Sequence, residues 1–212
     1  MNMEQGLAAL LLPVIAYLLG SIPFGLLIAR GLGRGDIRES GSGNIGATNV
    51  RRTVGTLPAV ATLTGDIAKG FLPVWWAGML TPPGPSSWAQ GFIALVGLCA
   101  LAGHLYPVFL KFRTGGKGVA TAAGGLLAIA PGALAVSGLV FVMAACSLNR
   151  VSAASLAATG TMPLTVWYAT GSGAFTLWAG VTAIWIWSRH RANIQRLLAG
   201  TEPPIWKSHS DG

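Results

Sequence analysis

Charge is scarce in this sequence: 9% of its 212 residues are Asp, Glu, Lys or Arg, whereas 52% are hydrophobic. Soluble domains carry about 25% charged residues, so the composition excludes an ordinary water-soluble domain. No ten-residue stretch alternates as a membrane β-strand does, while several apolar runs approach the roughly 20 residues that a spanning helix needs. We therefore expect an all-α integral membrane protein, with residues 1–212 forming one membrane-embedded domain.

Groups that hold metals or attack as nucleophiles are also few. Cys99 and Cys146 lie in separate apolar runs without CxxC spacing, so we expect them to be packing residues. No His, Cys and carboxylate cluster has metal-ligand spacing, and we predict neither a metal nor a cofactor. The G-x-S-x-G elbow of serine hydrolases is absent. No histidine begins the H-x4-D pattern of the soluble acyltransferases.

The apolar runs define the expected spans. The N-terminus, Met-Asn-Met-Glu-Gln, lacks the basic segment of a cleaved signal, so the first run is expected to be a retained span. Gly20 to Pro23 interrupt that run and predict a kink. Five spans are expected near residues 7–29, 57–80, 88–110, 153–170 and 172–188.

The remaining run, residues 119–148, is too long for one upright helix and contains Pro131 near its middle. If it crosses the membrane once, Arg150 and the basic C-terminal tail fall on the outer side. If it crosses twice, all fourteen Lys and Arg lie on or close to one side, as the positive-inside rule favours. We therefore predict a bundle of seven transmembrane helices with short or broken members, the N-terminus outside and the C-terminus and polar loops cytoplasmic.

The net charge of +8 then belongs to one membrane face, which suggests anionic lipid or substrate rather than nucleic acid. Four polar clusters share this face. They are residues 40–52, residues 115–118, residues 149–152 with Ser155, and residues 188–196.

The first cluster, Ser40 to Arg52, is rich in glycine, hydroxyl and amide groups. Its glycines allow backbone N–H groups to converge on an anion, and Arg51 and Arg52 supply positive charge. The plainer interpretation is a solvated turn. The second cluster, Gly-Gly-Lys-Gly at 115–118, precedes an apolar helix whose N-terminus favours anions. It is not a Walker A motif, because Gly118 follows the lysine, and an ordinary basic loop remains an alternative.

The other polar residues carry weaker signals. Ser152 and Ser155 are three residues apart, as are His190 and Asn193, so each pair shares a helix face. His104 precedes Tyr-Pro and is expected to orient the following loop. Asp66 and Lys69 are expected to neutralise each other as a structural pair, although ionisable groups within spans are often functional.

Together these segments resemble the bacterial acyl-phosphate:glycerol-3-phosphate acyltransferase (PlsY) family. The resemblance runs in order through nearly the whole chain. It rests on Gly20-Ser-Ile-Pro-Phe-Gly25, the loop 41–52, Gly65-Asp-Ile-Ala-Lys-Gly70, Gly103-His-Leu-Tyr-Pro107, Gly115-Gly-Lys-Gly-Val-Ala-Thr121, Val151-Ser-Ala-Ala-Ser155 and residues 190–202. Two departures are Tyr106, where phenylalanine is usual, and Arg113-Thr114, where a shorter step is usual.

The resemblance implies transfer of a fatty acyl group from acyl phosphate to the 1-hydroxyl of glycerol 3-phosphate. The products would be lysophosphatidic acid and phosphate, in the first acylation step of phospholipid biosynthesis. The family uses neither acyl-CoA nor acyl carrier protein directly. It also implies seven spans, a site facing the cytoplasm in the bacterial inner membrane, and activity without a protein partner.

The resemblance also suggests residue roles. His190, Lys117 and Arg52 are the candidate catalytic residues, and Ser155, His190 and Asn193 form the glycerol 3-phosphate pocket. The candidate phosphate-binding residues are Ser42, Gly43, Asn44, Gly46, Thr48, Asn49, Gly115 and Gly116.

The proton of the glycerol hydroxyl has two possible acceptors: the phosphate of the donor itself, or His190 acting as a general base. Two other functions remain open from the residues alone. A carrier of organic phosphates would place polar residues near the bilayer midplane, often with an inverted repeat, whereas these clusters gather at one face. A lipid-binding assembly factor would use the basic face alone.

Overall fold

The computed structural model of the chain describes residues 3–82, 84, 86–113 and 115–206. Thr114 of the basic loop, Pro83 and Pro85 of the uncharged turn, and Lys207 of the basic tail lie outside the described residues.

All regular secondary structure within the described ranges is helical. The long helices are α1 (Met3–Gly20), α4 (Thr56–Leu80), α5 (Ser87–Leu105), α7 (Pro131–Leu148), α8 (Val151–Thr170) and α9 (Gly173–Arg189). The shorter helices are α2 (Phe24–Gly31), α3 (Ala47–Thr53), α6 (Val119–Ile129), α10 (Arg191–Leu198) and the 3-10 turns η1 (Ile37–Glu39) and η2 (Val108–Leu110).

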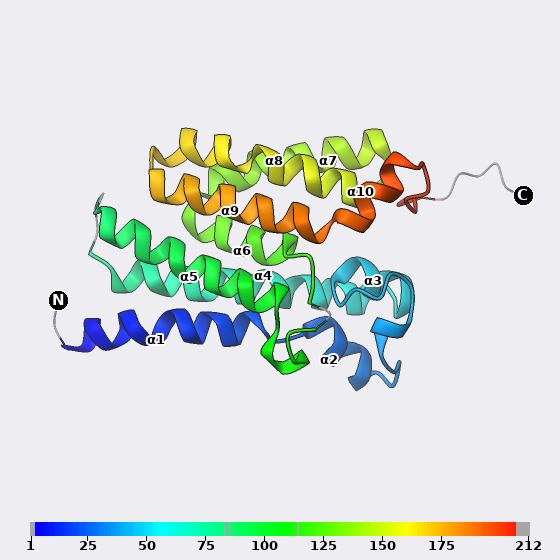
Figure 1. Cartoon of the computed structure of the whole chain (residues 1–212), viewed down its shortest axis with the longest axis horizontal. Helices are drawn as coiled ribbons and strands as arrows, with labels where there is room; N and C mark the ends of the chain where they lie inside the picture. Colours follow the sequence, from blue (N-terminus) through cyan, green and yellow to red (C-terminus); the bar gives the residue numbers. More distant parts are fainter. Residues whose placement is uncertain (1–2, 83, 85, 114, 207–212) are drawn as a thin grey trace, which may run out of the picture.

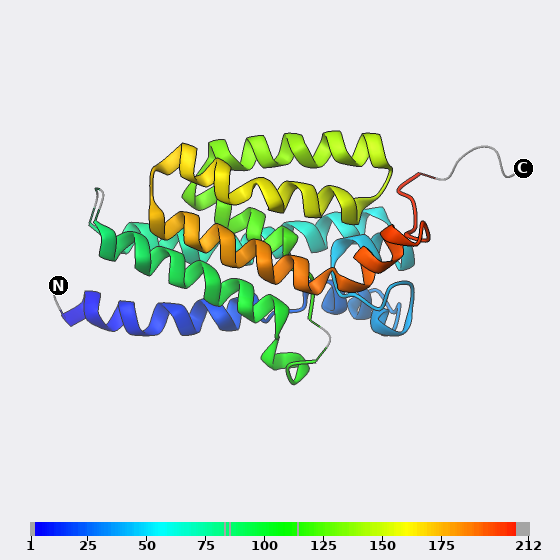
Figure 2. The same ribbon diagram turned by 45° about the horizontal axis from the view of Figure 1, so that its top comes forward.

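The long helices run side by side as an elongated bundle (Figures 1 and 2). Helix α6 packs against α4, α1 against α5, and α8 against both α7 and α9. Trp178 of α9 lies fully buried in a cluster with Leu126, Met162 and Val166, which joins α6, α8 and α9. Many large apolar side chains point outward instead, as expected where lipid replaces water.

The predicted kink in the first apolar run is confirmed. The segments Ala9–Gly20 and Phe24–Gly31 meet at 45°. Because Pro23 has no N–H and the helix breaks here, carbonyl groups lose their helical partners. The Ile22 carbonyl accepts a hydrogen bond from Lys69 Nζ at 2.8 Å. A side chain of α4 therefore satisfies the broken backbone.

The run 119–148 divides at Pro131, as predicted. Helix α6 ends at Ile129, and Pro131 begins α7 at the first helical position, where proline is favoured. The chain reverses direction between the two helices (Figures 1 and 2). Helix α6 has only 11 residues, in line with the expectation of an abbreviated member.

By length and composition alone, two helical segments within the described residues are long and apolar enough to cross a membrane: Ser87–Leu110 and Pro131–Leu148. The bent pair formed by α1 and α2 would provide a third. The other helices carry more polar groups or are shorter. The polar segments containing α2, α3 and α10 lie together at one end of the bundle, and the turns after α4 and α8 lie at the other (Figure 1).

Candidate active site

A cavity of about 180 Å³ lies at the polar end of the bundle. All four polar clusters contribute to its wall. Ten of the predicted site residues line it: Ser42, Asn44, Gly46, Thr48, Asn49, Arg52, Lys117, Ser155, His190 and Asn193. Gly43, Gly115 and Gly116 do not line it.

The first loop is folded around a buried amide, the side chain of Asn49. Its Oδ1 accepts from the Ser42 N–H at 2.8 Å, and its Nδ2 donates to the carbonyls of Ile37 and Ser40 at 3.0 and 3.1 Å. Gly41 has a φ of 62°, and a Cβ there would lie 2.3 Å from Asn49 Oδ1. Asn49 thus holds the loop's shape, and glycine is required beside it.

Three of the backbone N–H groups expected to bind an anion are engaged inside the loop. Ser42 N–H bonds to Asn49, Gly43 N–H to the Ser40 carbonyl, and Gly46 N–H to Asn44 Oδ1. The loop therefore presents side chains to the cavity. Ser42, Thr48 and Arg52 are exposed, and their side chains form an accessible rim around the cavity.

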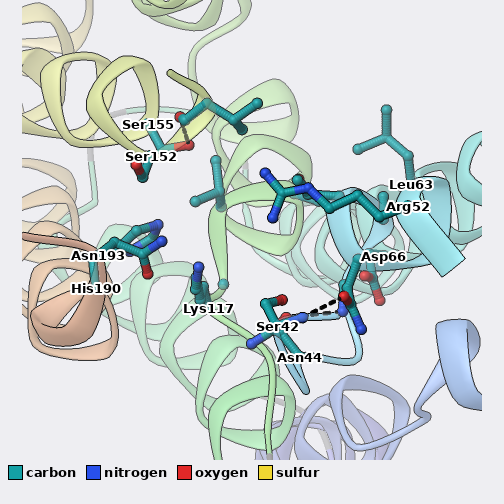
Figure 3. A pocket seen from close by; sticks show the side chains of 18 of the residues that line it. Ser42, Asn44, Arg52, Leu63, Asp66, Lys117, Ser152, Ser155, His190 and Asn193 are labelled. Carbon is teal, nitrogen blue, oxygen red and sulfur yellow. Dashed lines mark hydrogen bonds between the residues drawn. The ribbon is translucent and has the colours of Figure 1, made fainter. Parts of the chain in front are cut away.

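Lys117 extends from the second cluster into the cavity. In Figure 3 it lies between the His190–Asn193 pair on one side and Ser42 and Arg52 on the other. Burial lowers the pKa of Lys117 to about 8, opposed by Glu202 and reinforced by the nearby cations Arg196 and Arg52. Lys117 is therefore a cation at neutral pH that titrates close to the physiological range.

Gly115 and Gly116 support Lys117 from behind. The Gly116 N–H donates to the His104 carbonyl at 3.1 Å. A Cβ on Gly116 would lie 1.9 Å from His104 Nε2, and one on Gly115 would lie 1.9 Å from the Leu105 carbonyl oxygen. The backbone of His104 thus contacts the loop, and its imidazole packs where a side chain at Gly116 would lie.

His190 occupies the buried wall. Its Nδ1 lies 2.8 Å from the carbonyl oxygen of Ile186, one turn earlier on α9. A carbonyl only accepts, so Nδ1 carries the proton and Nε2 keeps its lone pair. Burial lowers the pKa of His190 to about 4, opposed by the Ile186 hydrogen bond, so the ring is neutral at pH 7.

Glu202 completes this wall and was given no role from the sequence. Its Oε1 accepts from Ser152 Oγ at 2.7 Å and from Asn193 Nδ2 at 2.6 Å, while Oε2 accepts from Arg196 Nε at 2.7 Å. Burial raises the pKa of Glu202, but these hydrogen bonds outweigh it, and the net shift is downward. The sequence signal that could have identified Glu202 is its position as a single acidic residue after a segment rich in arginine.

Ser155 lines the cavity and also bonds within its own helix. Its Oγ donates to the Val151 carbonyl at 2.9 Å (Figure 3). With its proton committed to the backbone, the hydroxyl oxygen remains an acceptor toward the cavity.

The expected Asp66–Lys69 pair is confirmed, with Lys69 Nζ 2.8 Å from Asp66 Oδ1 and both side chains buried. His104 Nδ1 lies 3.6 Å from the same oxygen. Asp66 and His104 also line the cavity, whereas Lys69 does not. No group of three or more His, Cys, Asp or Glu in the described part of the chain has the arrangement of a metal site.

Known proteins resemble this chain over most of its length. Residues 10–200 match the family described as Glycerol-3-phosphate acyltransferase. The chain therefore belongs to the glycerol-3-phosphate acyltransferase family. The enzyme of that name from Desulfotalea psychrophila is 45% identical over 195 residues, covering 92% of this chain and 96% of the relative. That of Methylorubrum extorquens is 46% identical over 194 residues, covering 92% and 91%.

Solved structures identify the branch of the family as the PlsY type. The crystal structure of PlsY, an integral membrane glycerol 3-phosphate acyltransferase, in its glycerol 3-phosphate form, superposes with a TM-score of 0.86. It is 40% identical, and the match covers 94% of this chain and 96% of that one. The lysophosphatidic acid form gives a TM-score of 0.83 at 40% identity, with coverages of 93% and 95%. The chain is accordingly an integral membrane acyltransferase of this type.

Proposed function

We propose that this protein transfers a fatty acyl group from acyl phosphate to the 1-hydroxyl of glycerol 3-phosphate, without a cofactor. The products are lysophosphatidic acid and inorganic phosphate. The observation that carries this proposal is that two cationic side chains, Arg52 and Lys117, and one neutral imidazole, His190, line the same cavity. The two cations suit the phosphates of the two substrates, and the imidazole suits the hydroxyl of glycerol 3-phosphate.

The cavity also has an apolar side that suits an acyl chain. Leu63 of α4, Ala120 of α6, Phe141 of α7 and Val151 of α8 line it. Leu63 is 42% exposed on the surface of the bundle, so this side of the cavity reaches the surface that we assign to lipid. A polar wall joined to an apolar one fits a donor with both a phosphate and a fatty chain.

The proton balance of the reaction favours a route that needs no strong base. The hydroxyl oxygen bonds to the acyl carbon, the bond from that carbon to the phosphate oxygen breaks, and the hydroxyl proton ends on the departing phosphate. A ring with a pKa of about 4 is a weak base. We therefore assign His190 Nε2 the role of accepting a hydrogen bond from the hydroxyl, while the phosphate takes the proton.

The cations supply the electrostatic part of the mechanism. Arg52 and Lys117 attract the phosphates and stabilise the charge that develops on the leaving group. The phosphate-binding walls are lined by Ser42, Asn44, Gly46 and Thr48. Behind them, Gly43, Gly115 and Gly116 give the two loops their shape, and Asn49 holds the first loop. Ser155 and Asn193 complete the glycerol 3-phosphate pocket. Positioning two reactants in one site is worth about 7–11 kcal/mol of barrier.

We further propose a single domain over residues 1–212 with seven spans, supplied by α1 to α2 together and by α4, α5, α6, α7, α8 and α9. The inner membrane of a bacterium is its location, the N-terminus lies outside, and the active site and C-terminus are cytoplasmic. The support is the distribution of Lys and Arg, which within the described residues lie in or close to the segments at the polar end of the bundle. No protein partner is required.

Purified protein supplied with palmitoyl phosphate and glycerol 3-phosphate tests the donor. We expect equal amounts of lysophosphatidic acid and phosphate, measured by mass spectrometry and a phosphate assay. Parallel reactions with palmitoyl-CoA and with palmitoyl-acyl carrier protein serve as controls and should give no product. Product from either control and none from palmitoyl phosphate would overturn the donor assignment.

A further inference from the structure

Arg189, the last residue of α9, reaches the loop that carries Lys117. Its Nη2 donates to the Gly115 carbonyl at 2.9 Å, and its Nε lies 3.3 Å from the Gly116 carbonyl oxygen. The guanidinium carbon also lies 5.7 Å from the centre of the Tyr106 ring. Both ribbon views place this end of α9 beside the segment leading into α6 (Figures 1 and 2). The side chain thus joins segments more than seventy residues apart.

These contacts fix the direction of two peptide planes. In a trans peptide the carbonyl and the following N–H point in opposite directions. The Gly115 carbonyl faces Arg189, and the Gly116 N–H accordingly points the other way, to the His104 carbonyl at 3.1 Å. The Gly116 carbonyl faces Arg189 as well, so the Lys117 N–H points away from it. The loop is held between a guanidinium on one side and the end of α5 on the other.

The orientation has an electrostatic consequence for the cavity. A carbonyl oxygen carries partial negative charge, which repels phosphate in a site of low dielectric. The guanidinium draws two such oxygens to itself. It is planar, permanently charged and presents several donors in a fixed fork, so it is suited to two adjacent carbonyls. A lysine ammonium in the same place has no such fork.

The position of Arg189 also links the two walls of the site. Its neighbour His190 is fixed by the Ile186 carbonyl at 2.8 Å. One short segment therefore sets both the imidazole on one wall and the Lys117 loop on the other. We propose that Arg189 is a positioning residue that orients the Gly115–Gly118 loop and Lys117 for phosphate binding. This inference rests on the proposed phosphate-binding role of that loop.

The experiment measures binding of inorganic phosphate and of glycerol 3-phosphate to purified protein, without any acyl donor. Arg189→Ala is expected to raise the Kd of at least one of these two ligands tenfold or more. The matched control is Arg191→Ala. It removes the same charge, two residues along the chain, at a position that is exposed. It should stay within twofold of the wild type. Equal effects of the two substitutions would mean that Arg189 acts only through the net charge of the protein, and would overturn the proposal.

A double-mutant cycle with Lys117→Ala separates positioning from general stability. If Arg189 acts through the Lys117 loop, the double variant loses less affinity than the product of the two single losses, because the second substitution removes a group already misplaced. Independent, multiplicative losses would contradict the proposal. Methylguanidinium is expected to restore part of the binding to Arg189→Ala, whereas methylammonium, which lacks the fork, is not.

Arg189→Lys keeps the charge and covers the case in which the alanine variant does not fold. Its thermal midpoint should match the wild type while phosphate binding stays weakened; wild-type binding would overturn the proposal. The outcome is independent of the donor. A wild-type protein that binds phosphate but makes no product from palmitoyl phosphate would refute the proposed donor and leave the role of Arg189 intact.

Discussion

His190 Nδ1 lies 2.8 Å from the carbonyl oxygen of Ile186, and this one contact determines which nitrogen can face a substrate. The ring donates backward along α9 and keeps an acceptor, Nε2, for the cavity. The same arrangement fixes the ring's orientation without help from a carboxylate. In the proposed reaction, this neutral and fixed acceptor orients the hydroxyl of glycerol 3-phosphate toward the acyl carbon.

His190 is predicted to remain neutral well below pH 6. Burial lowers its pKa from the ordinary 6.5 to about 4, so protonation opposes folding. The associated stability is fully present above pH 6.5 and is lost as the pH falls toward 4. Titration of ¹³C-labelled histidine by NMR, with His190→Ala to assign the signal, measures this directly. A midpoint near 6.5 would contradict the burial argument.

His190→Ala is also expected to raise the KM for glycerol 3-phosphate and to change kcat by less than about tenfold, because an orienting hydrogen bond is lost and no base is removed. Steady-state kinetics with both substrates varied provide the measurement. A collapse of kcat at unchanged KM would show instead that His190 takes the proton.

Lys117 should impose an alkaline limit on activity. Its pKa is lowered to about 8, so the cation is lost as the pH rises through that value, and phosphate is then attracted less strongly. We expect kcat/KM to fall about tenfold per pH unit above the limit. Lys117→Arg should remove the limit, since guanidinium stays protonated. The control Lys111→Arg, at an exposed position, should retain it; a limit that persists in Lys117→Arg would assign it to another group.

Gly116→Ala is predicted to reduce kcat/KM by about 10²-fold, because displacement of a catalytic loop by about an ångström costs this much. The new Cβ would lie 1.9 Å from His104 Nε2, so the backbone bearing Lys117 must move. Gly138→Ala is the matched control, since a Cβ there meets nothing within 4 Å. Similar activity of the two variants would mean that the loop accommodates the methyl group.

Glu202→Ala is expected to destabilise the polar end of the bundle by about 1–3 kcal/mol, because buried donors on Ser152 and Asn193 lose their acceptor. The lowered pKa of Glu202 means that its contribution is present above the ordinary value of 4.5 and lost as the pH falls below it. Thermal unfolding in detergent, compared with the exposed Glu39→Gln, measures the loss. Equal midpoints for the two variants would exclude this role.

The helices were predictable because their signals are the hydrophobicity of short segments and the distribution of charge along the whole chain. Apolar runs give the long helices, and the glycine and proline of residues 20–23 give the kink before Phe24. The division of the run 119–148 at Pro131 follows from the length of the run and the distribution of Lys and Arg. The grouping of the polar segments at one end follows from the distribution of Lys and Arg. Each of these signals is readable without knowing which helices touch.

The site was predictable as a set of segments but less so as a set of roles. Ser42, Lys117 and His190 do line one cavity. The hydrogen bonds of the Asn49 side chain to the loop backbone, however, form only because the loop folds back over itself. No rule of residue spacing predicts them. The contact of Arg189 with Gly115 depends on how α9 packs, which periodicity does not specify.

Helix α6 determines the depth at which the chemistry takes place. Its 11 residues rise about 16 Å, roughly half of a hydrocarbon layer about 30 Å thick. In the proposed orientation the segment Gly115 to Gly118 leads into this short helix, and we expect Lys117 to stand at the boundary between the lipid headgroups and the hydrocarbon layer. A water-soluble acceptor then has to sink into the bilayer only part way, while a donor anchored by its fatty chain need not rise out of it. A shortened helix thus brings two substrates from different phases to the same level.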